Sequence, residues 1–180
     1  MFRRLISFNE AKQILKQSFS PKPIGTENIS LSEAYSRVLA EDIVAQLDVP
    51  PFSRSTVDGY AVRAMDTFGA DEDQPVTLRL CGQVSVGEIP RVNVEKSMAA
   101  EIATGAPIPR GADAVVMLEY AVQKGDNVFV HRPISVGENV MKAGSDIPKG
   151  KTILKKGQAL SSREIGVLAA VGLKKVNVYK

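Results

Sequence analysis

Near the N-terminus, apolar residues recur at the spacing of one helix face. They are Phe8, Ala11, Ile14, Leu15 and Phe19. Ser7 and Glu10 stand at the start of this run at the spacing of a capping box, in which each side chain accepts a hydrogen bond from the other residue's backbone N–H. Pro21 and Pro23 follow, and proline cannot continue a helix. The pattern therefore predicts a capped helix that ends before Pro21.

The same Ser-to-Glu spacing occurs twice more. The box at 30–33 predicts a short helix that runs through Leu39. The box at 161–164 predicts a helix through Val171, and Gly172 stands where helices commonly end with a left-handed residue. The strands predicted to follow these two helices span 42–47 and 175–179.

Helical spacing disappears between about residues 50 and 140, where Gly and Pro recur. Short β-prone runs replace it, at 76–81, 114–118 and 128–131. The sequence Lys-Gly-Asp-Asn at 124–127 lies between the last two runs and is typical of a hairpin turn. This stretch predicts a compact β-rich unit.

The N-terminal and C-terminal segments are each predicted to contain a helix and a strand, whereas the middle of the chain is predicted to be β-rich. We therefore expect an α+β fold in which residues 1–49 and 141–180 form one discontinuous domain and residues 50–140 form an inserted β-rich domain. A chain of 180 residues can bury a core in one domain or in two small ones.

The composition is ordinary for a globular protein, with 44% hydrophobic and 24% charged residues. The formal charge of +3 is small, Lys and Arg are interleaved with acids, and Trp is absent, so nothing indicates a nucleic-acid partner. No apolar stretch approaches the length of a membrane span, and residues 1–13 lack the apolar segment of a signal peptide. We expect a cytoplasmic protein without a membrane partner.

Cys81 and His131 are the only Cys and His of the chain. A single Cys excludes an internal disulfide and a structural zinc site built on Cys. The two residues could form a catalytic dyad, but each lies in or beside an apolar, strand-like run. Packing is therefore the better interpretation of both.

The stretch from Pro50 to Val62, PPFSRSTVDGYAV, carries the most informative pattern. Its two prolines stiffen the start, because each fixes φ and removes a backbone donor. Asp58 and Gly59 then join a short acceptor side chain to a residue that can adopt positive φ, which predicts a rigid turn. On these residues alone, Asp58 either caps the backbone of its own turn or binds a metal ion or a phosphate.

This stretch resembles the signature of the molybdopterin molybdotransferases, the MoeA and gephyrin E-domain family. Three further segments resemble that family in its order and at its spacing: IATGAPIPRGADAVVMLE at 102–119, ENVMKAGSDIPKG at 138–150, and the closing LSSREIGVLAAVGLKKVNVYK. The resemblance implies a discontinuous elongated α/β domain, used for dimerisation, with an inserted compact β-rich domain. In the family a pterin-binding third domain and a small β-barrel follow, so we expect this chain to be the N-terminal and linker region of a longer protein.

Members of the family use adenylylated molybdopterin, molybdate and magnesium or another divalent cation, and they release AMP and molybdenum cofactor. The resemblance implies catalytic roles for Asp58, Thr104 and Asp146. Asp58 and Asp146 would hold the cation, since magnesium prefers oxygen ligands. The candidates for cofactor binding are Gly59, Gly105 and Lys142. Without the resemblance, Thr104 and Asp146 could equally be ordinary turn residues.

In the family the active cleft lies between the second domain of one protomer and the third domain of its partner. We therefore expect a homodimer, half of a composite site, and no activity from this region alone. The C-terminal pterin-binding domain and the molybdopterin adenylyltransferase are further expected partners. Two alternatives stay open: a non-catalytic dimerisation or scaffold module, and a small metal-dependent phosphohydrolase that uses Asp58 and Asp146.

Overall fold

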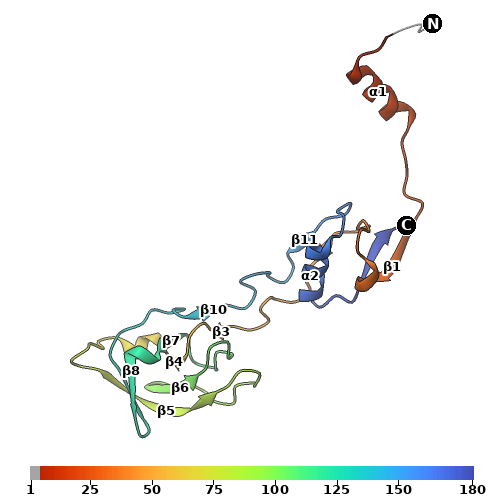
Figure 1. Ribbon diagram of the computed structural model, residues 1–180. Helices are drawn as coiled ribbons and strands as arrows, with labels where there is room; N and C mark the ends of the chain where they lie inside the picture. The colour runs from red at the N-terminus through yellow and green to blue at the C-terminus, as the bar shows by residue number, and fades with distance from the viewer. Residues whose placement is uncertain (1–4) are drawn as a thin grey trace. The chain divides into compact units, whose positions relative to one another are not determined.

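The computed structural model describes residues 5–180, and the chain divides into two compact units (Figure 1). The terminal unit consists of Met1–Ile43 and Leu154–Lys180, and the central unit of Val44–Ile153. Residues 1–4, which belong to the predicted first domain and to the N-terminal stretch analysed for a signal peptide, lie outside the described residues. The protein is a mixed α/β structure in which strands predominate.

Both α-helices of residues 5–180, α1 (Phe8–Ser18) and α2 (Ser162–Ala170), belong to the terminal unit. It also contains one antiparallel pair, β1 (Thr26–Ser30) with β12 (Lys175–Tyr179). The capping boxes predicted at the start of both helices are confirmed, with both reciprocal hydrogen bonds present. Gly172 has a φ of 82°, so the predicted left-handed end of α2 is confirmed as well.

The helix predicted from residue 30 through Leu39 is wrong. The chain makes a single 3₁₀ turn, η1 (Leu31–Glu33), in which the Ser30 hydroxyl accepts a hydrogen bond from the Ser32 N–H. Leu39 is 0% exposed, and it forms an antiparallel bridge with Val178 of β12. Burial of Leu39 against the C-terminal part of the chain outweighs the local capping signal.

The central unit is built on a six-stranded sheet with the order β7-β4-β6-β5-β9-β8 (Figure 1). Its strands are β4 (Gly59–Val62), β5 (Val76–Val84), β6 (Met98–Ile102), β7 (Ala114–Met117), β8 (Ala121–Lys124) and β9 (Asn127–Val130). Neighbouring strands are antiparallel, except for the parallel pair β5 and β6. The register shifts between Leu80 and Gln83, where Gly82 has a φ of 146°, and such irregularities bend a sheet.

Shorter elements complete the structure. β3 (Arg54–Ser55) pairs with β10 (Val140–Met141), and β2 (Ile43–Val44) pairs with β11 (Thr152–Leu154). Two further 3₁₀ turns, η2 (Ala64–Thr67) and η3 (Leu118–Tyr120), follow β4 and β7. No helix within residues 5–180 has both the length and the apolar character needed to cross a membrane.

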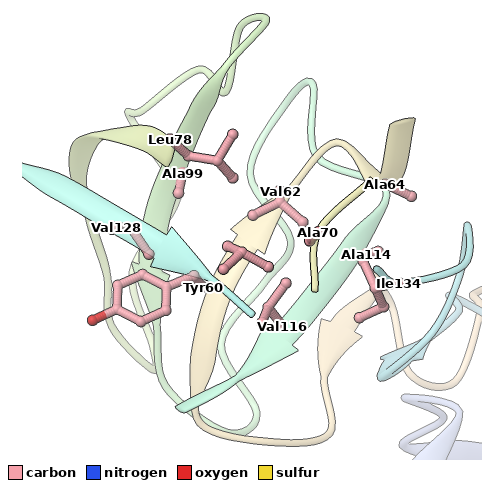
Figure 2. Packing of buried hydrophobic residues seen from close by; sticks show 11 residues of the cluster. Tyr60, Val62, Ala64, Ala70, Leu78, Ala99, Ala114, Val116, Val128 and Ile134 are labelled. Carbon is pink, nitrogen blue, oxygen red and sulfur yellow. The ribbon is translucent and has the colours of Figure 1, made fainter. Parts of the chain in front are cut away.

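Both faces of the six-stranded sheet are buried at β4. On one face Tyr60 and Val62 of β4 pack with side chains from β5, β6, β7 and β9, and Figure 2 shows them turned toward one interior. On the other face Ala61 belongs to a second cluster with Val84 and Ile102. All four residues of β4 are buried, so tight packing on both sides fixes the segment that precedes this strand.

Most strands predicted from the sequence are present. Those expected at 76–81, 114–118, 128–131 and 175–179 correspond to β5, β7, β9 and β12, and the one expected at 42–47 is shortened to β2. The hairpin turn at 124–127 is confirmed, but it joins β8 to β9. The strand β7 pairs with β4 instead, because η3 turns the chain away before the hairpin begins.

The two units divide at residues 43/44 and 153/154, whereas the sequence analysis placed the joints at 49/50 and 140/141. Backbone pairing explains the difference. The Val49 N–H donates to the Ile147 carbonyl at 2.9 Å, and the Ala45 N–H donates to the Lys151 carbonyl at 2.9 Å. Residues 44–49 and 141–153 therefore run side by side within the central unit.

Candidate functional site

The short strand β3 brings three of the sequence blocks together. On one side the Ser55 N–H donates to the Ala106 carbonyl at 3.0 Å, and the Ser55 carbonyl accepts from the Gly105 N–H at 2.8 Å. On the other side β3 pairs with β10. The blocks at 50–62, 102–119 and 138–150 are therefore neighbours in the central unit, although they are far apart in sequence.

Asp58 and Thr104 are in direct contact. Oδ1 of Asp58 accepts a hydrogen bond from the Thr104 backbone N–H at 2.7 Å. The carboxylate thus restrains the loop after β6 and does not cap its own turn. Both residues are exposed, and no hydrogen bond within residues 5–180 engages the Thr104 hydroxyl or the second carboxylate oxygen of Asp58. These two oxygen atoms remain accessible to a ligand.

The turn predicted at Asp58 and Gly59 does not use a positive φ at Gly59. Gly59 is the first residue of β4 and lies outside the set of glycines with positive φ. A Cβ at this position would lie 1.9 Å from the Val116 carbonyl oxygen. Glycine is therefore required here because the backbone of β7 packs closely against β4, and not because of a turn.

Gly105 occupies a tight turn. The Ala106 N–H donates to the Ala103 carbonyl at 3.0 Å, and Gly105 has a φ of 83°. A positive φ at the third residue of such a turn favours glycine. Gly105 is half-buried, and Thr104 beside it is exposed.

Asp146 and Lys142 lie on the loop after β10, and both are exposed. The Asp146 N–H donates to the Val49 carbonyl at 3.0 Å, and the Ser145 N–H donates to the Lys142 carbonyl at 3.2 Å. This hydrogen bond joins Asp146 to Val49, not to Asp58 or Thr104. The structure thus brings Asp58 and Thr104 together and leaves Asp146 on a neighbouring loop.

A cavity of about 170 Å³ lies beside Asp58. Its lining includes two polar residues that the sequence analysis missed, Gln83 and Glu101. The sheet register explains their presence, since Gln83 of β5 is paired with Glu101 of β6, next to Ile102, which is opposite Gly59. The carboxyl ends of β5 and β6 therefore lie beside the start of β4, at one end of the sheet. Glu101 could have been placed here only if β6 had been predicted.

Magnesium, a hard cation, prefers oxygen ligands, and the side chains at this end of the sheet offer oxygen atoms. Within residues 5–180 there is no group of three or more His, Cys, Asp or Glu that could hold a metal ion. Magnesium commonly binds through one or two carboxylates together with substrate phosphates and water. The Asp58 carboxylate is of the type that supplies one such ligand, and the Thr104 hydroxyl lies on the loop that this carboxylate holds.

Cys81 and His131 have separate surroundings. Cys81 is half-buried in β5, and this burial raises the pKa of its thiol. The Nδ1 atom of His131 lies 3.1 Å from the Glu72 carbonyl oxygen. A raised thiol pKa opposes thiolate chemistry, which agrees with packing as the role of Cys81.

Comparison with known proteins finds relatives along almost the whole chain. The family model described as MoeA N-terminal region (domain I and II) matches residues 6–172. A molybdopterin molybdenumtransferase from Staphylococcus epidermidis is 38% identical over 179 residues, which cover 99% of this chain and 42% of the relative. A putative molybdopterin biosynthesis protein from Methanocaldococcus jannaschii is 35% identical over 184 residues, which cover 99% of this chain and 44% of that relative.

A solved structure agrees with these relatives. The crystal structure of the molybdopterin biosynthesis MoeA protein from Pyrococcus horikoshii OT3 is 41% identical to this chain, with a TM-score of 0.88. The match covers 97% of this chain and 46% of that one. The chain therefore spans less than half the length of the relatives it matches.

Proposed function

Since the chain belongs to the family of MoeA N-terminal regions, we propose that it is the N-terminal part of a molybdenum insertase of molybdenum cofactor biosynthesis. The full protein would convert adenylylated molybdopterin and molybdate into molybdenum cofactor and AMP. The observation that supports this proposal most strongly is the hydrogen bond between Asp58 and Thr104, which joins two sequence blocks 46 residues apart at an exposed cavity.

Each candidate residue has a role in this proposal. Asp58 holds the Thr104 loop in place and supplies one oxygen ligand to the cation, and the Thr104 hydroxyl donates to a phosphate oxygen. Gly59 and Gly105 allow close packing and a tight turn next to the substrate. Lys142 attracts anions, and Asp146 supplies a second carboxylate from the neighbouring loop. A bound magnesium ion would offset the negative charge that develops on the scissile phosphate oxygen.

These residues would form half of a composite site. In our proposal the central unit is a domain inserted into the terminal unit, and the terminal unit mediates a homodimer. The pterin would be held by the C-terminal region of the family, contributed by the partner protomer. The adenylyltransferase that produces the adenylylated substrate is a further proposed partner, and the proposed location is the cytoplasm.

An alternative function, a non-catalytic dimerisation or scaffold module, is favoured by α1. None of the residues of this helix is buried, although Phe8 and Leu15 line its apolar face, and the C-cap residue Phe19 is exposed as well. An amphipathic helix of this kind normally covers its apolar face with a partner. Assembly and catalysis are compatible, and substitution of Asp58 separates them.

The test uses three variants of the full-length protein. Asp58→Ala removes both the charge and the acceptor for the Thr104 N–H, whereas Asp58→Asn removes the charge and keeps an acceptor. We expect both to lower the yield of molybdenum cofactor by about a hundredfold, the scale of losing one electrostatic contact to a reacting centre. Sedimentation should show an unchanged dimer.

Asp42→Asn is the matched control, because the Asp42 carboxylate also accepts a backbone hydrogen bond, from the Lys156 N–H at 2.7 Å, but in the terminal unit. Its cofactor yield should equal that of the parent. A parental yield from Asp58→Asn would refute the role of Asp58 as a cation ligand and leave it as a clamp for the Thr104 loop. A full-length parent that yields no molybdenum cofactor would refute the insertase proposal.

A further inference from the structure

A second, apolar hollow lies next to the candidate site, beside the loop that follows β5. Its volume is about 300 Å³, and it is lined by Phe52, Gly87, Glu88, Ile89, Pro90 and Pro107. This volume is at the lower end of the range of small-molecule sites, roughly 300–1,000 Å³. All of the lining side chains except Glu88 are apolar.

Shared residues connect this hollow to the Asp58 cavity. A third cavity, lined by Gln83, Glu88, Ile89 and Arg91, has Glu88 and Ile89 in common with the apolar hollow. It has Gln83 in common with the Asp58 cavity. A concave strip therefore runs from Asp58, past Arg91, to Phe52. Arg91 is exposed and forms no ion pair within residues 5–180.

The walls of the strip are held in place by backbone contacts. A Cβ on Gly82 would lie 2.6 Å from Val92 Cγ1, so the end of the loop packs directly on β5. Beyond the loop, the Val94 N–H donates to the Arg110 carbonyl at 2.8 Å. On the opposite wall the Ile108 N–H donates to the Ser53 carbonyl at 2.9 Å, which keeps Phe52 beside Pro107. These contacts hold the C-terminal end of the loop and the opposite wall of the hollow in place.

We propose that this hollow binds the adenine ring of the adenylylated substrate, an inference that rests on the function proposed above. A flat heteroaromatic ring suits a surface made of one aromatic ring and two prolines, because stacking needs a π-face and few matching hydrogen bonds. Arg91 then faces the negatively charged phosphates between the ring and Asp58. The pterin, whose edge carries many donors and acceptors, fits this apolar lining less well.

The probe is AMP, added to the 180-residue chain with and without magnesium and followed by NMR of side-chain signals. AMP and adenosine should both shift the Phe52 ring and the Ile89 methyl signals, whereas ribose 5-phosphate should leave them unchanged. Phe52→Ala should raise the Kd for AMP by about tenfold, as expected for the loss of one stacking side chain. Ile89→Ser, at a position that is 88% exposed, gives a second variant that does not threaten folding.

Two matched variants sharpen the result. Phe68→Ala removes another exposed phenylalanine, just after η2, and should leave the Kd for AMP unchanged. Arg91→Ala should weaken AMP binding without affecting adenosine, because only AMP carries the phosphate charge.

Absence of shifts at Phe52 and Ile89 with millimolar AMP would overturn the inference. So would concentration-dependent broadening of these signals without nucleotide, because the hollow would then be a surface for protein association. A negative result for AMP binding does not affect the interpretation of the Asp58 variants, since those variants are tested by cofactor yield. Conversely, AMP binding at Phe52 together with no cofactor yield from the full-length parent would retain a nucleotide site and refute the insertase proposal.

Discussion

The helices α1 and α2 begin in the same way and have different surroundings. Both start with a capping box in which a Ser hydroxyl accepts one backbone hydrogen bond and a Glu carboxylate accepts another. In α2, Leu168 is 0% exposed and Glu164 is 5% exposed. In α1, by contrast, no residue is buried, and Leu15 is 66% exposed.

The comparison separates two sources of helix stability. A capping box determines where a helix starts, and it contributes to both helices alike. Tertiary packing provides most of the remaining stability, and only α2 has it within the described chain. An isolated helix of 11 residues is marginal in water, so α1 depends on its caps and on whatever covers its apolar face.

The largest difference should appear when an apolar side chain is truncated in each helix. Leu168→Ala removes a fully buried side chain and should lower the free energy of unfolding by about 2–5 kcal/mol. Leu15→Ala should change it by less than about 0.5 kcal/mol, because its side chain is largely exposed. Urea denaturation of the 180-residue chain measures both values.

Sedimentation of the same two variants extends the test to assembly. If α1 contributes to a dimer, Leu15→Ala should shift the protein toward monomer while its unfolding stays unchanged. Equal losses of stability from the two substitutions would show that α1 packs within the chain, and the contrast between the helices would disappear.

Removal of the N-cap hydroxyl should give a smaller difference. Ser161→Ala should lower the free energy of global unfolding by roughly 1 kcal/mol, because α2 unfolds together with the core of its unit. Ser7→Ala should leave global unfolding unchanged and accelerate hydrogen exchange in α1 alone, since that helix can fray by itself. Hydrogen exchange of the amides in both helices checks this, and protected α1 amides in Ser7→Ala would contradict it.

The same contrast explains how much of the fold the sequence could predict. Capping boxes and β-branched runs act locally, so α1, α2, β5, β9 and β12 were predicted close to their observed bounds. By contrast, β4 and β6 were not predicted. Their sequences, Gly-Tyr-Ala-Val and Met-Ala-Ala-Glu-Ile, contain small residues that favour a strand only between two other strands.

The candidate site shows the same limit. Asp58 and Thr104 could be named from their motifs, but their hydrogen bond depends on β4 and β6 lying side by side. Glu101 escaped notice because it belongs to the unpredicted β6. The sequence pattern indicated that position 59 needs glycine. However, glycine is needed because the carbonyl of Val116 lies close by, and this tertiary contact cannot be seen in any local pattern.

The smallest predicted effect is the dependence of the free energy of unfolding on pH at low pH. It again distinguishes the capping carboxylate of α2, Glu164, from that of α1, Glu10. The hydrogen bond from the Ser161 hydroxyl, followed by those from Arg163 and the Ser161 N–H, lowers the pKa of Glu164 from 4.5 to about 2. A carboxyl group whose pKa is lower in the folded state stabilises the protein above the unfolded pKa, and this contribution is lost as the pH falls through the folded pKa.

The stability gap between the parent and Glu164→Gln should therefore be constant above about pH 5 and should close between pH 4.5 and about 2. The hydrogen bonds from Ser7 also lower the pKa of Glu10. However, Glu10→Gln should show no such gap in global unfolding, because α1 can melt separately. Urea denaturation at a series of pH values measures both gaps. A gap for Glu164→Gln that persists unchanged at pH 2 would mean that the ionised capping box does not stabilise α2.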